Sequence, residues 1–200
     1  MRESAPAAQK GPDPSAPDPR VVRSRTSVIV ATRAILRESG FSGATIEAVS
    51  VRSGVAKTTI YRQWKDRNEL LLDAFSFNMA MVIFPATHDL RADLCLGLNM
   101  LCRELYSSEW VGLMPAMIEA SERDPEFLAM SRSLIDSRRK PLKDRLQLAF
   151  RRGELSDDTD METLLAVLTG PLFYRRLVAH QPMKRTLVDD LVDLVLRGAA

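Results

Sequence analysis

The stretch from Thr45 to Trp64 limits what this chain can fold into more than any other part of the sequence. Apolar residues recur at three-to-four spacing on both sides of Ser53-Gly54, which predicts two short helices that each bury one face. A glycine can take the left-handed conformation that ends a helix and redirects the chain, so a tight turn is expected at Gly54. The apolar positions are Ile46, Val49, Val55, Ile60 and Trp64.

Polar and cationic side chains remain for the outer face of the second short helix, and they are the donors that phosphates and base edges accept. They are Lys57, Thr58, Thr59, Tyr61 and Arg62.

Residues 1–70 carry 12 Lys and Arg against 7 Asp and Glu, a net charge of +5, whereas residues 71–200 carry 16 against 19, a net charge of −3. A cationic N-terminal part fits a polyanionic partner, although so small an excess is equally explained by solubility.

The order and spacing of these residues resemble the DNA-binding domain of the TetR family of bacterial transcriptional regulators. The resemblance is carried by Gly40-Phe41, Thr45-Ile46, Gly54-Val55, the run from Lys57 to Arg62, Trp64, and the run from Asp66 to Leu70. A second stretch is similar to the C-terminal domain of one TetR subgroup, in Arg152–Leu155 and Gly170–Leu177. The chain departs from the common family pattern at Ala56 and Thr58, where Ser and Gly are usual.

The resemblance and the helical periodicity imply an all-α fold. An N-terminal three-helix helix-turn-helix domain is expected over residues 21–66, and a C-terminal helical ligand-binding and dimerisation domain over residues 67–200. The proline-rich residues 1–20 are expected to be a disordered tail. Expected helices cover about 22–39, 45–52 and 57–63. Thr45 and Asp66 suit helix N-caps, and the helix from Asp66 is expected to run towards Phe84-Pro85.

Three further features of the C-terminal part concern proline. Pro141 is expected to kink or split a long helix that opens near Asp124-Pro125. Gly170-Pro171 is expected to bend the next helix, and Pro182 to begin the last one.

The resemblance implies contacts with double-stranded DNA from the second and third helices. We expect base-edge or adjacent contacts from Lys57, Thr58, Thr59 and Arg62, and phosphate contacts from Thr45, Tyr61 and Arg67. Arg20, Arg23 and Arg25 at the start of the first helix are further candidates for the DNA backbone or minor groove, or else are simply solvated.

The last two helices are apolar over more than a surface helix needs, and in the TetR family the matching pair forms a four-helix bundle in a homodimer. Packing within one chain is the alternative. The family also places a small-molecule effector pocket in the C-terminal domain. Its tentative lining is Met100, Trp110, Met114, Met117, Phe127 and Phe173, which could equally be plain core.

Other functional classes find little support. No phosphate loop, HExxH, GxSxG or paired-carboxylate motif is present, so we predict neither an enzyme nor a cofactor. Cys95 and Cys102 lack metal-ligand spacing and read as reduced thiols, so no metal is predicted. No apolar run is long enough to span a membrane, and no signal peptide is recognisable, which favours the cytoplasm.

The expected function is therefore a dimeric transcriptional regulator, most simply a repressor that binds a palindromic operator and is released by an effector. An activator, a regulator without a ligand, and an all-helical protein-interaction module remain as alternatives. Steep loss of affinity with added salt would separate a DNA binder from the last of these.

Overall fold

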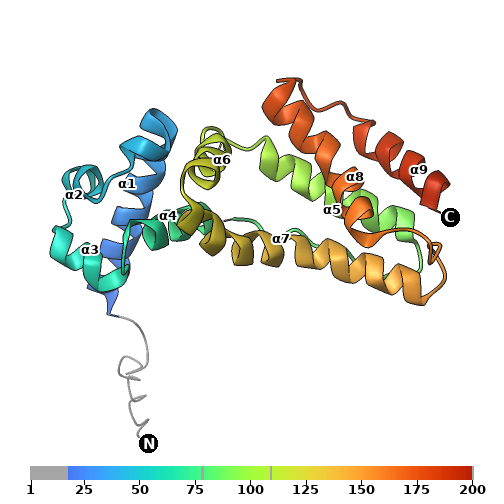
Figure 1. Ribbon diagram of the computed structural model, residues 1–200, viewed down its shortest axis with the longest axis horizontal. Helices are drawn as coiled ribbons and strands as arrows, with labels where there is room; N and C mark the ends of the chain where they lie inside the picture. Colours follow the sequence, from blue (N-terminus) through green and yellow to red (C-terminus); the bar gives the residue numbers. More distant parts are fainter. Residues whose placement is uncertain (1–17, 78, 109, 200) are drawn as a thin grey trace, which may run out of the picture.

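The computed structural model describes residues 18–77, 79–108 and 110–199, which fold into helices without a strand in those ranges (Figure 1). The elements are α1 (Pro19–Gly43), α2 (Ile46–Ser53), α3 (Lys57–Gln63), α4 (Arg67–Ser76), α5 (Leu90–Leu105), α6 (Leu113–Arg123), α7 (Pro125–Arg151), α8 (Met161–Phe173), the π-helical turn η1 (Tyr174–Val178) and α9 (Leu187–Ala199). The all-α prediction is confirmed. Of the expected tail, residues 1–17 lie outside the described ranges, and residues 19 and 20 are helical.

The first hydrophobic core holds α1–α4 together and also takes in parts of α6 and α7. Its fully buried members include Val28, Ile29, Val49, Ile60, Leu70, Leu71 and Phe127. The Phe127 ring of α7 packs edge-on between two rings of this end, at centroid distances of 5.8 Å from Phe41 and 5.9 Å from Phe75. One core therefore joins the small helices to the beginning of the long helix α7.

Gly40 ends the regular part of α1, as the sequence predicts. Its backbone has φ 66° and ψ −168°, which is not helical and favours glycine. A glutamate of α6 then accepts a hydrogen bond from the chain just after this break, since the Phe41 N–H lies 3.3 Å from Glu119 Oε2. The end of α1 is thus fastened to α6.

Helix α4 ends at Ser76, so the prediction that it continues towards residues 84–85 is wrong. The buried guanidinium of Arg33 donates to two carbonyls at this end, Ala74 O at 3.0 Å and Phe77 O at 2.6 Å. A continuing helix would need the Ala74 carbonyl for its own hydrogen bond. The long-range contact from α1 therefore replaces a further helical turn.

Residues 79–89 cross to α5 without helix, as a segment that we call the strap. Arg138 of α7 donates to Ala80 O at 2.9 Å, and the Phe84 ring lies directly over Gly97 of α5. A side chain larger than hydrogen at Gly97 would overlap that ring, because a Cβ there would lie 2.2 Å from Phe84 Cδ1. The strap is held by side chains on both neighbouring helices.

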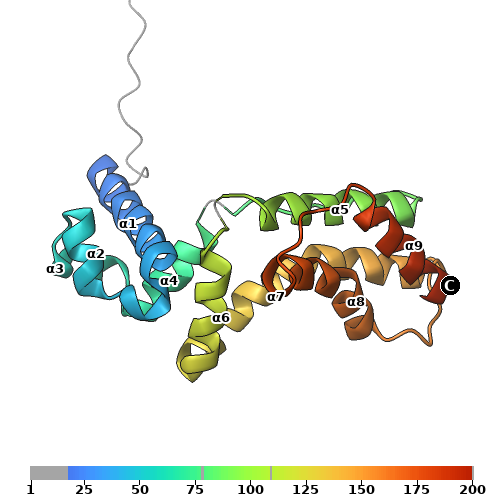
Figure 2. The same ribbon diagram turned by 90° about the horizontal axis from the view of Figure 1, so that it is seen from above.

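A second hydrophobic core lies between α5, α7, α8 and α9, which form the end of the molecule far from α3 (Figure 2). It encloses one charged pair: Arg145 Nε lies 2.7 Å from Asp93 Oδ2, and both side chains are almost fully buried. Arg145 also donates to Glu154 at 3.1 Å. Ion pairing lets these charges be buried at tolerable cost.

The prolines inside helices interrupt less than expected. Helix α7 runs unbroken through Pro141, and α8 includes Gly170-Pro171. No split occurs at Pro141. Irregularity appears instead after α8, in η1, where the hydrogen-bond pattern widens to that of a π-helix.

The last helix begins at Leu187 and not at Pro182. Side chains of other elements hold the carbonyls of the preceding segment: Tyr106 Oη donates to Gln181 O at 2.8 Å, and Arg175 Nη2 donates to Pro182 O at 3.1 Å. These contacts hold residues 181 and 182 in a segment without helix.

Candidate nucleic-acid interface

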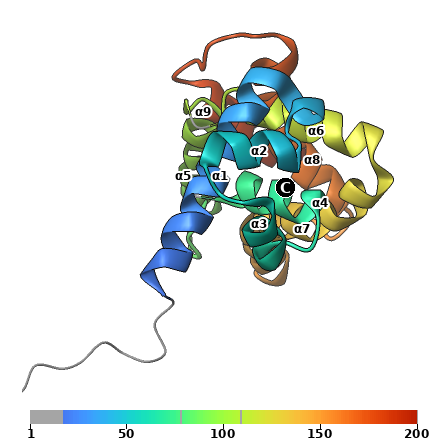
Figure 3. The ribbon, with the colours of Figure 1, turned by 90° about the vertical axis from the view of Figure 1, so that its left-hand side faces the viewer.

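Helix α3 divides cleanly into a buried and an exposed face. Ile60 and the adjoining Trp64 are buried in the first core, with Ile60 wholly inaccessible to solvent. Most of the remaining positions face outward. Helix α3 lies at the end of the molecule that faces the viewer in Figure 3, and Figures 1 and 2 show α5, α8 and α9 at the opposite end. The exposed members are Lys57, Thr58, Tyr61 and Arg62, whereas Thr59 is half-buried. The structure thus gathers these sequence-predicted residues on one helix.

The turn between α2 and α3 has the geometry that the sequence predicts. Gly54 adopts the left-handed conformation with φ 69° and ψ 11°, and its N–H bonds back to Ser50 O. Ser50 Oγ also donates to Val55 O at 2.8 Å, which fixes the chain as it enters α3. The short connection holds α3 at a set angle to α2, because both its ends are hydrogen-bonded.

The beginning of α3 lacks a side-chain cap. Ala56 occupies the N-cap position, and no side chain accepts a hydrogen bond from the first turn. Helix N-termini attract anions because their first N–H groups are unpaired and the helix dipole is positive there. The unpaired N–H groups next to Lys57 can therefore bind an anionic group. A serine at the N-cap would compete with that group for the same N–H groups.

Thr45 is exposed and caps α2. Its Oγ1 accepts a hydrogen bond from Ala48 N–H at 3.1 Å. The hydroxyl hydrogen is still free to donate, since the cap uses only the oxygen lone pair. A phosphate contact from Thr45 is compatible with this cap.

Arg67 makes several contacts within the protein. Its Nε donates to Ala44 O at 2.8 Å, its Nη2 donates to Phe41 O, and its guanidinium lies 4.1 Å from the centroid of the Phe41 ring. Burial lowers the pKa of the Arg67 guanidinium, and the charge of Asp124 opposes that shift. The side chain fastens α4 to the end of α1, and it is committed to protein groups.

Arg25 is likewise tied to the protein. Its Nη2 lies 2.5 Å from Asp73 Oδ2, and its guanidinium lies 5.9 Å from the Trp64 ring. The same Asp73 oxygen accepts from Trp64 Nε1 at 2.9 Å. Arg20 and Arg23 remain exposed at the beginning of α1.

An ion pair that was not predicted from the sequence joins α2 and α3. Lys57 Nζ of α3 forms an ion pair with a carboxylate oxygen of Glu47 in the first turn of α2. The hydrogen bond from Lys57, with its charge second, holds the pKa of Glu47 below its usual range. Ten residues separate the pair, so helical periodicity gives no signal; the only clue is that both residues lie in first turns of adjoining helices.

Four of the six predicted pocket residues are divided between the two hydrophobic cores. Phe127 lies in the first core with Met117 packed against it, whereas Met114 and Phe173 pack against the second core. Trp110 is buried and donates from Nε1 to Glu104 at 2.6 Å, and Met100 is half-buried. Two open grooves in the described part of the chain are lined by none of the six.

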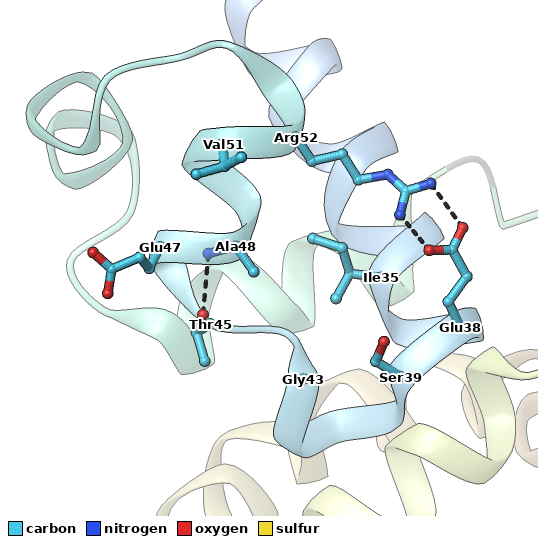
Figure 4. Close-up of a pocket in the computed structure, with 9 residues that line it drawn as sticks. All are labelled: Ile35, Glu38, Ser39, Gly43, Thr45, Glu47, Ala48, Val51 and Arg52. Atoms are coloured by element: carbon cyan, nitrogen blue, oxygen red, sulfur yellow. Dashed lines mark hydrogen bonds and ion pairs between the residues drawn. The ribbon is translucent and has the colours of Figure 1, made fainter.

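One of these grooves lies between α1 and α2, with a volume of about 590 Å³ (Figure 4). The guanidinium of Arg52 pairs with both carboxylate oxygens of Glu38 across it. Glu47 projects from the other side of α2, away from this pair. The second groove, about 390 Å³, lies between the strap and α7.

Metal binding, the two thiols and membrane insertion were the other possibilities raised by the sequence, and the described part of the chain bears on each. No group of three His, Cys, Asp or Glu side chains there could hold a metal ion. Burial raises the pKa of the Cys95 thiol to about 11 and that of Cys102 to about 12. No described helix combines the length and apolar character needed to cross a bilayer.

Both the N-terminal and the C-terminal part of the chain match models of known protein families. Residues 28–74 match the model of the bacterial regulatory proteins of the tetR family, and residues 84–195 match that of the tetracyclin repressor-like C-terminal domain. A DNA-binding transcriptional repressor TetR of Mycobacteroides abscessus is 32% identical over 178 residues, which cover 87% of this chain and 92% of that protein. An HTH-type transcriptional regulator of Mycobacterium tuberculosis is 30% identical, covering 94% of this chain and 92% of its own length.

Solved structures share the fold. The crystal structure of the TetR family regulator SCO0332 is 29% identical with a TM-score of 0.67, over 89% of this chain and 99% of that one. FadR of Bacillus subtilis in complex with stearoyl-CoA is 16% identical with a TM-score of 0.70, over 88% of this chain and 99% of that one, a likeness of fold alone. With its helix-turn-helix, its helical C-terminal part and these relatives, the chain is a transcriptional regulator and not an enzyme, and it belongs to the TetR family.

Proposed function

We propose that this regulator places α3 in the major groove of double-stranded DNA. The observation that carries the proposal is the division of α3, where Ile60 and Trp64 are buried while Lys57, Tyr61 and Arg62 are exposed. An α-helix fits the major groove, and cationic and hydroxyl side chains bind its base edges and the flanking phosphates.

The contacts divide by chemistry. Lys57, Thr58, Thr59 and Arg62 are the proposed base-edge or adjacent contacts, and Tyr61 and Thr45 are the proposed phosphate contacts. Thr59 contributes less than the others, because it is half-buried. Arg67 is left out of the set, since its guanidinium already bonds to Phe41 O and Ala44 O.

A homodimer that binds a palindromic operator is the proposed assembly. Exposed residues follow one stripe of α8 and η1, and several of them are apolar or small: Val167, Gly170, Tyr174 and Val178. Such a stripe suits a two-fold contact between copies, because residues three or four apart share a face. Two α3 helices would then meet half-sites roughly 34–36 Å apart or a near multiple.

The sign and trigger of regulation are proposed by similarity. The Mycobacteroides abscessus relative is a repressor, which favours repression, in the cytoplasm, where the bacterial DNA lies. The FadR structure holds stearoyl-CoA in the same fold, and at 16% identity this likeness identifies no ligand for this chain. A pocket would open beside Met114 and Phe173, at the partly buried edge of the second core. An effector would act only through its differential affinity for two states.

Selection of bound duplexes from a random pool tests the proposed function. The wild-type protein is expected to enrich a palindrome, and its affinity should fall steeply with salt because bound phosphates release counterions. Arg62→Ala should weaken binding to the selected duplex by about tenfold or more, the loss of one good base contact. Arg132→Ala, which removes an exposed cation of α7, is the matched control and should bind as wild type. Equal losses in both variants, or no selected sequence at all, would reject the proposal.

A further inference from the structure

The ion pair between Glu47 and Lys57 lies beside the proposed DNA-reading face. Its two side chains come from the first turns of α2 and α3, and they are 74% and 47% exposed. Glu47 is directed away from the Glu38–Arg52 pair on the other side of α2 (Figure 4). It therefore brings a negative charge to the α3 side of the domain.

A carboxylate in this place opposes binding to DNA of arbitrary sequence. Non-specific affinity comes from cations that neutralise phosphates, and Lys57 adds no net charge to this region while Glu47 is bound to it. When Lys57 turns to DNA, Glu47 loses its partner and faces a polyanion. The penalty applies to every duplex that offers Glu47 no hydrogen-bond donor.

One base edge in the major groove offsets that penalty. The cytosine N4 amino group is a donor that Glu and Asp accept from, whereas guanine presents only acceptors in that groove and thymine presents an acceptor and a methyl group. Adenine N6 also donates, but beside the N7 acceptor, which repels a carboxylate. Cytosine is the base that compensates Glu47 best.

We propose that Glu47 is a specificity-determining residue that selects against duplexes lacking a cytosine at one base pair of each half-site. The proposal rests on the proposed DNA-binding function. Glu47 acts mainly by weakening binding to duplexes without that cytosine, and less by attracting the correct one. It also controls whether Lys57 is free to contact DNA.

The variant Glu47→Gln tests this in the full-length protein. Its affinity for a random-sequence duplex should rise about three- to tenfold at 0.1 M salt, and the salt dependence should steepen by about one unit, as for one added phosphate contact. Selection from a random pool should lose the cytosine preference at one base pair per half-site. With Lys57→Met in the same chain, the steeper salt dependence should disappear.

Glu38→Gln is the matched control, because it removes the same charge from another exposed ion pair of the same domain. It should leave the base preference unchanged and raise random-duplex affinity less than Glu47→Gln does. Both side chains are exposed, so thermal unfolding should show all variants folded.

The outcomes separate this inference from the proposed function. A wild-type protein that binds no duplex would overturn DNA binding itself. A wild-type protein that selects a palindrome, with Glu47→Gln giving an unchanged base preference or an effect equal to that of Glu38→Gln, would overturn the role of Glu47 alone.

Discussion

At the residue scale, the Arg67 guanidinium donates hydrogen bonds to two backbone carbonyls of the same chain, and this predicts a structural role. The Arg67→Met variant should be less stable by about 1–3 kcal/mol, because it leaves the Ala44 carbonyl without a donor and removes one of the two donors to the Phe41 carbonyl, the other being Ala44 N–H. Arg67→Lys should lose less, since an ammonium keeps a donor but cannot hold both carbonyls in the same geometry. Urea unfolding of the three proteins measures these differences.

The same variants separate a structural role of Arg67 from a phosphate contact. A residue that only fastens α4 to α1 leaves the salt dependence of binding to random duplex unchanged, provided the variant is folded at the assay temperature. A phosphate contact would lower that dependence by about one unit in Arg67→Met. The structural role predicts equal slopes.

At the element scale, local signals predicted most of the helices. Thr45 and Asp66 cap α2 and α4 through their side chains, and Gly54 provides the left-handed turn, because each of these features depends on residues close in sequence. The residues of α3 were predicted within the same bounds. Its outward face follows from the burial of Ile60 and Trp64.

What the sequence did not reveal depends on contacts between distant residues. The apolar run after α4 is compatible with a helix. Long-range contacts fix it as the non-helical strap, among them Arg33 of α1 at the end of α4 and Arg138 of α7 at Ala80. The Glu47–Lys57 pair was missed for the same reason, since two helix starts come together only when the turn at Gly54 has formed.

The strap makes a prediction about Gly97. Gly97→Ala should lower the melting temperature, because the new methyl group overlaps the Phe84 ring and the strap must move away from α5. In a Phe84→Ala background the ring is gone, and alanine should then stabilise α5 by up to about 1 kcal/mol through its better helix propensity. A reversal of sign between the two backgrounds is the expected result. The same loss in both would show that Phe84 is not the obstacle.

The cap of α7 makes a prediction about pH. Asp124 accepts hydrogen bonds from the N–H groups of Glu126 and Phe127, and the bond to Phe127 is the main cause that lowers the pKa of this carboxyl below its ordinary value of 3.8. A lowered pKa in the folded state stabilises the protein above the ordinary value, and this stability is lost as pH falls through the lowered value.

Asp124→Ala should therefore unfold at lower urea concentration than wild type at pH 7 and at pH 5. The gap should narrow only when the pH falls below about 3.8. Urea midpoints measured from pH 7 to pH 3 test this. A gap that narrows between pH 7 and pH 5 would mean that another group is titrating.

At the scale of the whole molecule, the two cores are joined by α7 and by α6, whose Leu113 belongs to the first core and whose Met114 packs against the second. Phe127 at the beginning of α7 belongs to the first core, whereas Leu146 near its end belongs to the second. Glu119 of α6 holds the chain just after Gly40. Helix α7 therefore forms a packed connection between the core of the proposed effector domain and the helices that position α3.

The exposed stripe on α8 makes the last prediction, which concerns assembly. Val167→Glu places a charge in the proposed two-fold contact, where it would be buried, and the dimer should dissociate to monomers at micromolar concentration. Sedimentation velocity measures the change. Val51→Glu is the matched control, because Val51 is 82% exposed on α2, at the other end of the molecule. The control should sediment as wild type.

Because each monomer reaches only one half-site, Val167→Glu should also bind the selected palindrome no more tightly than a duplex that carries one half-site. A variant that stays dimeric would place the contact between copies elsewhere on the surface.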